Sequence, residues 1–176
     1  MSGSEVHQVW LGIGSNIERD YHIRAAVEAL SATFSEVRLS LIYESEAAGF
    51  EGPPFYNLVA WIETSKSLAE LQKWCKAVEQ RLGRVVSAER FSSKTMDIDI
   101  LLYDDVVAEA TATTPKLPRG EVLKSAFVLA PMAELVPYMT HPVSGKSYQQ
   151  HWIEYKASNE ETGILGVAPY PWPKAI

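Results

Sequence analysis

The stretch "SSKTMDIDILLYDD", residues 92–105, places two aspartates inside an otherwise apolar segment. Ile98 and Ile100 alternate with Asp97 and Asp99, and this two-residue period predicts a β-strand whose isoleucines face the core. The two carboxylates then lie on one face of the strand, with Cα atoms about 6.5 Å apart. Carboxylates held this close repel each other unless a cation lies between them, and such oxygen ligands suit Mg²⁺. Alternatively, both acids solvate an open sheet face or pair with Lys and Arg.

A basic segment precedes the aspartates. Residues 81–94 contain four cations, Arg81, Arg84, Arg90 and Lys94, against the single acid Glu89, so the local balance is +3 in a chain of net charge −6. Cations beside a carboxylate pair are typical of a metal and polyphosphate site, because they neutralise the phosphate oxygens that the metal leaves bare. The alternative is a solvated basic loop that pairs with those same aspartates.

The rest of the chain alternates predicted strands and helices. Apolar runs and period-two alternation predict strands within residues 6–15, 36–46 and 55–65. Helical spacing predicts a helix over 20–34, a second over 67–83 with a capping box at Ser67 and Glu70 and a C-cap at Gly83, and a third pattern over 120–137 that Pro131 breaks. The order strand, helix, strand, strand, helix, strand predicts an α/β (α+β) fold of the ferredoxin-like sandwich class, with helices packed on a mostly antiparallel sheet.

Length and composition bound the organisation. With 176 residues, of which 47% are hydrophobic, the chain is long enough for one domain, which we expect to span residues 1–156. Residues 157–176 contain three prolines and little periodicity, so we expect a tail that wanders or docks on the surface. The proline- and glycine-rich residues 46–54 are predicted to form an exposed loop.

The net charge of −6 argues against a nucleic-acid or anionic-membrane partner, because such binders normally carry a basic surplus. The single cysteine, Cys75, cannot form an internal disulfide, and the chain has neither a signal-like opening nor a run of about 20 apolar residues. We therefore expect a cytoplasmic protein. "GIGSN" lacks the glycine spacing and the Lys-Ser/Thr of a P-loop, so phosphate binding must rest on side chains and metal.

Five segments together resemble the 6-hydroxymethyl-7,8-dihydropterin pyrophosphokinases of folate synthesis. They occur in the family's order and spacing over about residues 8–147: "LGIGSN", "YESEAAGF" with "PPFYN", "RFSSKTMDIDILLY", "AFVLAPMAEL" and "HPVSGKS". The resemblance implies a ferredoxin-like fold and transfer of the β,γ-diphosphate of MgATP to the pterin hydroxymethyl group, with release of AMP. It also implies that pterin and ATP are the binding partners, and we expect a monomer.

The resemblance assigns roles to individual residues. Asp97 and Asp99 match the aspartates that bind two Mg²⁺ ions. Asn57 matches the asparagine that hydrogen-bonds the pterin, and Ser45 stands where a threonine usually does the same. Phe55 and Phe127 match the aromatic pair that sandwiches the pterin ring. Arg84 matches a basic residue of a catalytic loop, and Phe91 stands for that loop's aromatic residue.

The nucleotide side departs from the family pattern. Where the family usually has Gly-Pro-Arg before the aspartates, this chain has Ser92-Ser93-Lys94. Lys94 keeps the positive charge, but a lysine cannot form the bidentate hydrogen bonds of an arginine guanidinium. A Pro-His signature appears as Pro118-Arg119. The arginine before the late Phe-Val-Leu is Ser125, with Lys124 beside it. Arg84, Arg90, Lys94, Arg119 and Lys124 are therefore the candidate phosphate-binding cations. The loops 46–54 and 84–95 are expected to close over the substrates and exclude water.

Two alternative hypotheses for the function compete with this one, and the first of them follows from these departures. A paralogue that binds a pterin but has lost efficient catalysis would act as a binding or regulatory module, and it would bind pterin without MgATP-dependent product. A nucleotidyltransferase also combines a Gly-Ser turn with paired aspartates. In that superfamily the two motifs lie close together, whereas Ser15 and Asp97 are 82 positions apart here, so this reading is disfavoured.

Overall fold

A computed structural model describes residues 5–47, 51–83 and 96–172. The strands form one sheet in the order β5-β1-β4-β3-β6, with β2 also beside β4, and every pairing is antiparallel. Their bounds are β1 His7–Ser15, β2 Val37–Leu39, β3 Ile42–Ser45, β4 Phe55–Thr64, β5 Asp97–Tyr103 and β6 Ile164–Ala168. The sheet order and the helix after each of β1 and β4 confirm the predicted ferredoxin-like arrangement.

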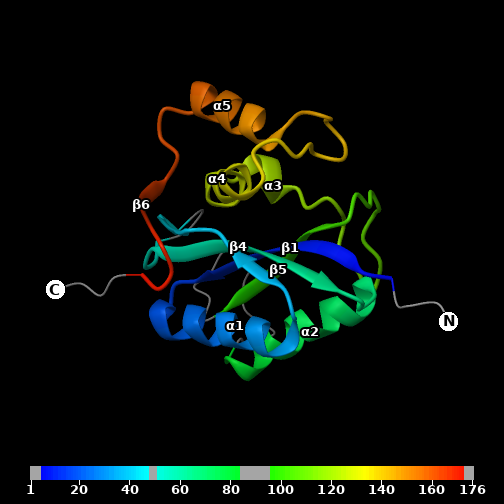
Figure 1. Cartoon of the computed structure of the whole chain (residues 1–176). Coiled ribbons are helices and arrows are strands. Elements are labelled where there is room, and N and C mark those ends of the chain that lie inside the picture. Colours follow the sequence, from blue (N-terminus) through cyan, green and yellow to red (C-terminus); the bar gives the residue numbers. More distant parts are fainter. Residues whose placement is uncertain (1–4, 48–50, 84–95, 173–176) are drawn as a thin grey trace.

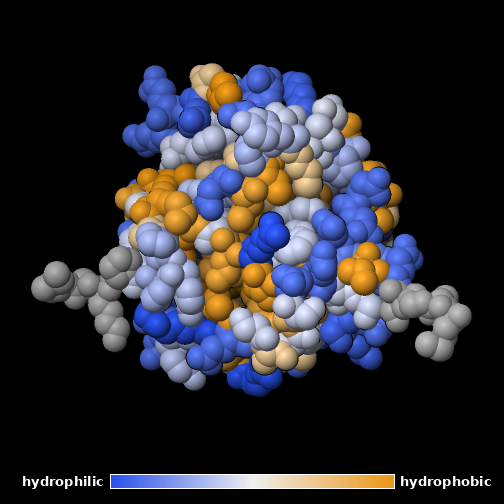
Figure 2. All heavy atoms as spheres, in the orientation of Figure 1, coloured by the Kyte–Doolittle hydropathy of each residue, from blue (hydrophilic) through white to orange (hydrophobic). Residues whose placement is uncertain are grey.

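Helices cover both faces of the sheet (Figure 1). The bounds are α1 Arg19–Thr33, α2 Leu68–Arg81, α3 Glu121–Lys124, α4 Ala126–Leu135 and α5 Tyr148–Ser158. Helices α1 and α2 lie together on one face, and α3, α4 and α5 lie on the other. In the same orientation, Figure 2 shows apolar side chains gathered in the middle of the molecule, between more polar upper and lower regions. Two apolar cores result, one on each side of the sheet.

Helix α2 forms where the sequence predicts it. Ser67 and Glu70 make both hydrogen bonds of a capping box, each 3.2 Å long. Gly83, just beyond the helix, has a φ of 91°, the left-handed conformation that favours glycine at a helix end. Leu71, Cys75 and Val78 form the buried stripe of the helix. The thiol of Cys75 lies in the core, and burial raises its pKa far above the ordinary value.

The expected break at Pro131 is wrong. Helix α4 runs through Pro131, and the interruption lies six residues earlier at Ser125, where the backbone is extended with φ −118° and ψ 122°. Proline removes one helical hydrogen bond, but α4 is almost wholly apolar and most of it is buried against the sheet. Packing therefore outweighs the local cost of proline.

The residues after α5 differ from the expected surface tail. Residues 164–168 form strand β6, which pairs with β3 in the main sheet, and Tyr170 and Trp172 pack against the core beneath it. The alternation is hard to see in the sequence, because Gly166 and Ala168 supply small side chains on one face. The domain boundary at residue 156 stays a prediction.

Among the described residues, no helix is both long and apolar enough to cross a membrane.

Candidate active site

Asp97 and Asp99 lie on β5, as predicted, on the sheet face covered by α3, α4 and α5. Ile98 and Ile100 point the other way and are 1% and 0% exposed. Asp97 lies opposite Gly14 of β1, and Asp99 lies opposite Gly12. Cross-strand partners share a face, so the residues beside the carboxylates on β1 contribute no side chains of their own. The Leu101 side chain lies over Gly12, and the Asn57 amide lies over Gly14.

The carboxylate pair is electrostatically strained. Desolvation and, after it, the neighbouring carboxylate of Asp97 together raise the pKa of Asp99 to about 7, although Arg119 acts in the opposite direction. A divalent cation between the two groups would relieve this repulsion. Within residues 5–47, 51–83 and 96–172 no three acidic, His or Cys side chains form a metal cluster. Two carboxylates fit Mg²⁺, which commonly binds one or two carboxylates and completes its shell with water and substrate phosphates.

Arg119 lies beside the aspartates, although it is 20 positions from Asp99 in sequence. Its Nη2 is 3.2 Å from Oδ1 of Asp99. Its backbone N–H donates to the Leu101 carbonyl at 3.0 Å, which ties this residue to β5. Its Nε lies 3.2 Å from Oε2 of Glu121 in an ion pair without hydrogen-bond geometry. The structure thus brings one predicted phosphate-side cation to the carboxylate pair.

Glu79 of α2 supports strand β5 from the sheet face opposite the aspartates. Strand β5 is at the edge of the sheet that the described residues form, so the Ile98 N–H, between the two aspartates, faces no neighbouring strand among them. Oε1 of Glu79 accepts this N–H at 2.9 Å, and Oε2 lies 3.4 Å from Nζ of Lys76. The Glu79 side chain is 1% exposed, and a buried carboxylate is stable only with such partners. Glu79 therefore fixes the backbone that carries the pair.

We expect Glu79→Leu to raise the Mg²⁺ concentration needed for half-maximal activity by about tenfold or more, the usual cost of losing an outer-shell partner of metal ligands. Glu79→Gln keeps an acceptor for the Ile98 N–H and should stay close to the unaltered protein. Activity titrated with Mg²⁺, with thermal unfolding as the folding check, tests this. Identical Mg²⁺ requirements in both variants and the unaltered chain would contradict the role.

Asn57 and Ser45 form a second polar group on the same face of the sheet, which we call the amide arm. Nδ2 of Asn57 donates to Oγ of Ser45 at 2.7 Å and to the Tyr43 carbonyl at 3.3 Å. A Cβ on Gly14 would lie 3.0 Å from Oδ1 of Asn57, so glycine at this position gives the amide room to lean over β1. Asn57, Gly14 and Asp97 consequently form one row across β4, β1 and β5. The row joins the amide arm to the aspartate pair.

Helix α4 is fastened to the strand that carries this arm. The hydroxyl of Tyr43 donates to Oε1 of Glu134 at 2.9 Å. The Leu41 N–H points at both carboxylate oxygens of Glu134, at 3.1 and 3.2 Å. Burial, followed by the Glu134 carboxylate, raises the pKa of Tyr43 well above its ordinary value, so the phenol stays a donor. Glu134 therefore sets the position of α4 over β3.

The two candidate ring-binding aromatics lie on these elements. Phe55 begins β4, opposite Ser45 of β3, and is half-buried. Phe127 lies in the first turn of α4 and packs partly against the core on the site's side of the sheet. Lys124 ends α3 with an exposed side chain. Arg84, Arg90, Phe91 and Lys94 lie outside the described residues.

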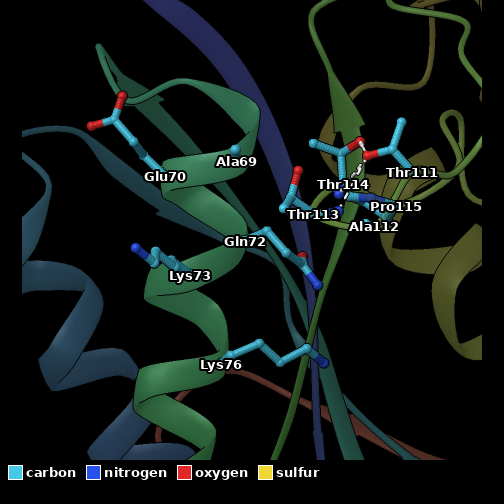
Figure 3. A pocket seen from close by; sticks show the side chains of 10 residues that line it. All are labelled: Ala69, Glu70, Gln72, Lys73, Lys76, Thr111, Ala112, Thr113, Thr114 and Pro115. Carbon is cyan, nitrogen blue, oxygen red and sulfur yellow. Dashed lines mark hydrogen bonds between the residues drawn. The ribbon is translucent and has the colours of Figure 1, made fainter.

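A cavity of about 530 Å³ opens between α2 and residues 111–115 (Figure 3). Gln72, Lys73 and Lys76 line it from the helix, and threonines line the opposite wall, where Thr111 and Thr114 hydrogen-bond at 2.6 Å. Lys76 also reaches Glu79. The cavity is therefore linked through two side chains to the backbone between the aspartates.

Three supporting residues were missed in the sequence: Glu79, Glu134 and Tyr43. Glu79 carried a signal, because it continues the spacing of Leu71 and Cys75 along the apolar stripe of α2. A carboxylate at a core position predicts a buried partner. Glu134 and Tyr43 carried none, since their contact joins segments 91 positions apart.

An antiparallel α/β sandwich with a carboxylate pair and an adjacent arginine is the arrangement expected of a metal-dependent phosphotransferase. The chain belongs to the 7,8-dihydro-6-hydroxymethylpterin-pyrophosphokinase (HPPK) family, whose family model matches residues 10–137. Members of this family use ATP as co-substrate and generally require Mg²⁺. The chain is thus an ATP-dependent pyrophosphokinase of folate biosynthesis.

Curated relatives agree with this assignment. The chain is 36% identical over 155 residues to the 2-amino-4-hydroxy-6-hydroxymethyldihydropteridine pyrophosphokinase of Aquifex aeolicus, an alignment covering 86% of this chain and 91% of the relative. It is 32% identical to the protein of the same name from Synechocystis, over 94% and 83% of the two chains. A folate synthesis bifunctional protein of Chlamydia muridarum is 35% identical, and the match covers 80% of this chain and 33% of that protein.

Solved structures share the fold. Plasmodium falciparum HPPK-DHPS with pterin and p-hydroxybenzoate matches with a TM-score of 0.66 at 12% identity, over 93% of this chain and 46% of that one. An HPPK-DHPS in complex with substrates matches with a TM-score of 0.65 at 12% identity, over 88% and 44%. The chain spans less than half the length of these solved chains. None of the comparisons favours a pterin-binding module without activity.

Proposed function

We propose that Asp97 and Asp99 hold two Mg²⁺ ions at which this chain transfers diphosphate from ATP to 6-hydroxymethyl-7,8-dihydropterin. The row formed by Asn57, Gly14 and Asp97 carries the proposal, because it sets the candidate acceptor-binding amide and a carboxylate on either side of a residue that has no side chain. When bound, Mg²⁺ supplies charge neutralisation and alignment of the triphosphate. The carboxylates anchor that charge.

The amide arm suits the edge of a pterin ring. Both protons of Asn57 Nδ2 point at Ser45 and Tyr43, so its Oδ1 is the group presented over Gly14. Ser45 accepts from Asn57 and keeps its own hydroxyl proton for donation. The pair therefore offers one acceptor and one donor, which complements the ring N–H and ring nitrogen of a pterin. Phe55 and Phe127 would pack on the ring faces.

The reaction exchanges one phosphorus–oxygen bond for another. The pterin hydroxymethyl oxygen forms a bond to the β-phosphorus of ATP and loses its proton, and the bond from the β-phosphorus to the α,β-bridging oxygen breaks to release AMP. Such chemistry depends on alignment and charge neutralisation. Arg119, already beside Asp99, together with Lys124 and the basic residues Arg84, Arg90 and Lys94 outside the described ranges, would neutralise the phosphate oxygens.

The nucleotide would approach from the outer edge of β5. The amide arm lies on the β4 side of the aspartates, so the donor must reach them from another direction. The cavity beside α2 lies within the range of small-molecule sites, its lysines suit a nucleotide, and Lys76 reaches Glu79 behind β5. We propose that it receives part of ATP.

Calorimetric titration with 6-hydroxymethyl-7,8-dihydropterin, with and without Mg²⁺ and a non-hydrolysable ATP analogue, tests the function together with an AMP-release assay. We expect nucleotide-dependent pterin binding and release of AMP. A Lys76→Met variant should weaken the nucleotide titration and leave pterin binding intact when the nucleotide analogue is saturating. Pterin binding that ignores the nucleotide, without AMP release, would instead identify a binding module.

A further inference from the structure

Strand β6 completes the sheet where the amide arm is built. Ile42, Tyr43, Glu44 and Ser45 of β3 are all in register with β6, and the Glu46 N–H donates to the Gly163 carbonyl at 3.0 Å. Without β6, the four-residue strand β3 would be an open edge, with β4 as its one neighbouring strand among the described residues. Tyr43 and Ser45, the two partners of Asn57, both lie on this strand. Order in β3 therefore decides the geometry of the arm.

Trp172 packs against β6 on the sheet face opposite the amide arm. Its ring lies against Tyr56, with ring centroids 4.9 Å apart and planes inclined at 30°. It also covers Gly166 of β6, where an added Cβ would meet the Trp172 ring at 3.2 Å. Tyr56 stands between Phe55 and Asn57 on β4 and is 6% exposed. A contact that fixes Tyr56 fixes the backbone of both candidate pterin-binding neighbours.

Arg19 extends the same cluster to the chain before β4. Its guanidinium lies 3.7 Å from the centre of the Tyr56 ring. It pairs with Glu44 of β3 at 2.6 Å and donates to the Pro54 carbonyl at 3.2 Å. The rings of Trp172 and Tyr56 and the guanidinium of Arg19 thus join β6, β4, β3 and the entry to Phe55 into one unit.

We propose that residues 164–172, which we call the C-terminal segment, position the pterin-binding ends of β3 and β4, with Trp172 as the anchoring residue. The segment lies beyond the residues matched by the family model, which end at 137. The proposal rests on the proposed function, because it needs Asn57 and Ser45 to bind the pterin. Trp172 is a positioning residue that acts through Tyr56 and does not touch the substrates' reacting atoms.

The test is steady-state kinetics with pterin varied at saturating MgATP, and then with ATP varied at saturating pterin. Trp172→Ala should raise the KM for pterin by about tenfold, since small misplacements of binding groups have effects of this order. The kcat and the KM for ATP should stay unchanged. Trp172→Phe keeps an aromatic ring on Tyr56 and should restore most of the pterin affinity.

Trp152 provides a matched control. It is also a half-buried tryptophan stacked on a tyrosine, with its ring 5.8 Å from that of Tyr155, but it lies in α5 away from the amide arm. Trp152→Ala should leave both KM values unchanged even if it lowers the melting temperature. Equal pterin KM values in Trp172→Ala and the unaltered chain, or an equal rise in Trp152→Ala, would overturn the positioning role.

Two further variants keep the test decisive. Gly166→Ala pushes the Trp172 ring without removing it, so it should raise the pterin KM modestly even where Trp172→Ala fails to fold. An unchanged KM in Gly166→Ala, with Trp172→Ala unfolded, would overturn the proposal. Asn57→Ala distinguishes an error in the proposed pterin site from an error in the positioning role. An unchanged pterin KM in Asn57→Ala would show that the proposed pterin site is wrong. A raised pterin KM in Asn57→Ala, together with an unchanged value in Trp172→Ala, would show that the positioning role is wrong.

Discussion

Asp99→Asn should lower kcat by roughly a thousand-fold while the protein stays folded. Asparagine keeps the size of the side chain and removes the charge that would anchor the cation. Metal ions contribute several kcal/mol to transition states of this type, and about 4 kcal/mol corresponds to roughly a thousand-fold in rate. Asp97→Asn should have an effect of the same order. The AMP-release assay at saturating substrates and Mg²⁺ measures both.

Asp99→Asn should not lower the free energy of unfolding in metal-free buffer. Because desolvation and Asp97 raise the pKa of Asp99, its charged form disfavours the folded state at neutral pH, and a neutral side chain removes that cost. The lost pairing with Arg119, whose side chain is 30% exposed, offsets only part of this gain. Thermal unfolding without metal measures it.

Asp105 provides the matched control for the carboxylate pair. It lies six positions beyond Asp99, is exposed and follows the end of β5. Asp105→Asn should therefore leave kcat and the Mg²⁺ requirement unchanged. Normal turnover in Asp97→Asn or Asp99→Asn would show that the metal assignment is wrong.

Asn57→Ala should raise the Kd for pterin by about a hundredfold. The substitution removes the acceptor over Gly14 and leaves the buried Ser45 and Tyr43 groups without their partner, and an unsatisfied buried polar group costs about 1–3 kcal/mol. Nucleotide binding, which the proposed site places on the other side of the aspartates, should change little. Calorimetric titration of each ligand separates the two effects.

Asn159→Ala is the control for Asn57. Its Nδ2 also donates to a backbone carbonyl, that of Tyr155 at 2.8 Å, but it lies at the end of α5. Its removal should leave pterin binding intact. If Asn57→Ala and Asn159→Ala bind pterin equally well, Asn57 does not contact the ring.

Local pattern predicted much of the fold. The capping box at Ser67 and Glu70 and the alternation around Asp97 and Asp99 act between residues two to four positions apart, so the sequence alone indicates them. Pro131 misled the interpretation, because its local cost is outweighed by the burial of α4. Strand β6 escaped notice because its small residues on one face hide the alternation.

The sequence by itself determined the order of the elements up to β5, the common face of the two aspartates and the resemblance to the pyrophosphokinase family. Only the tertiary structure decided that Arg119 meets Asp99, that Glu79 bonds the Ile98 N–H, and that Trp172 closes over Tyr56. The reason is physical. Periodicity encodes which face of an element is apolar, whereas the pairing of elements depends on burying those faces together across long separations in the chain.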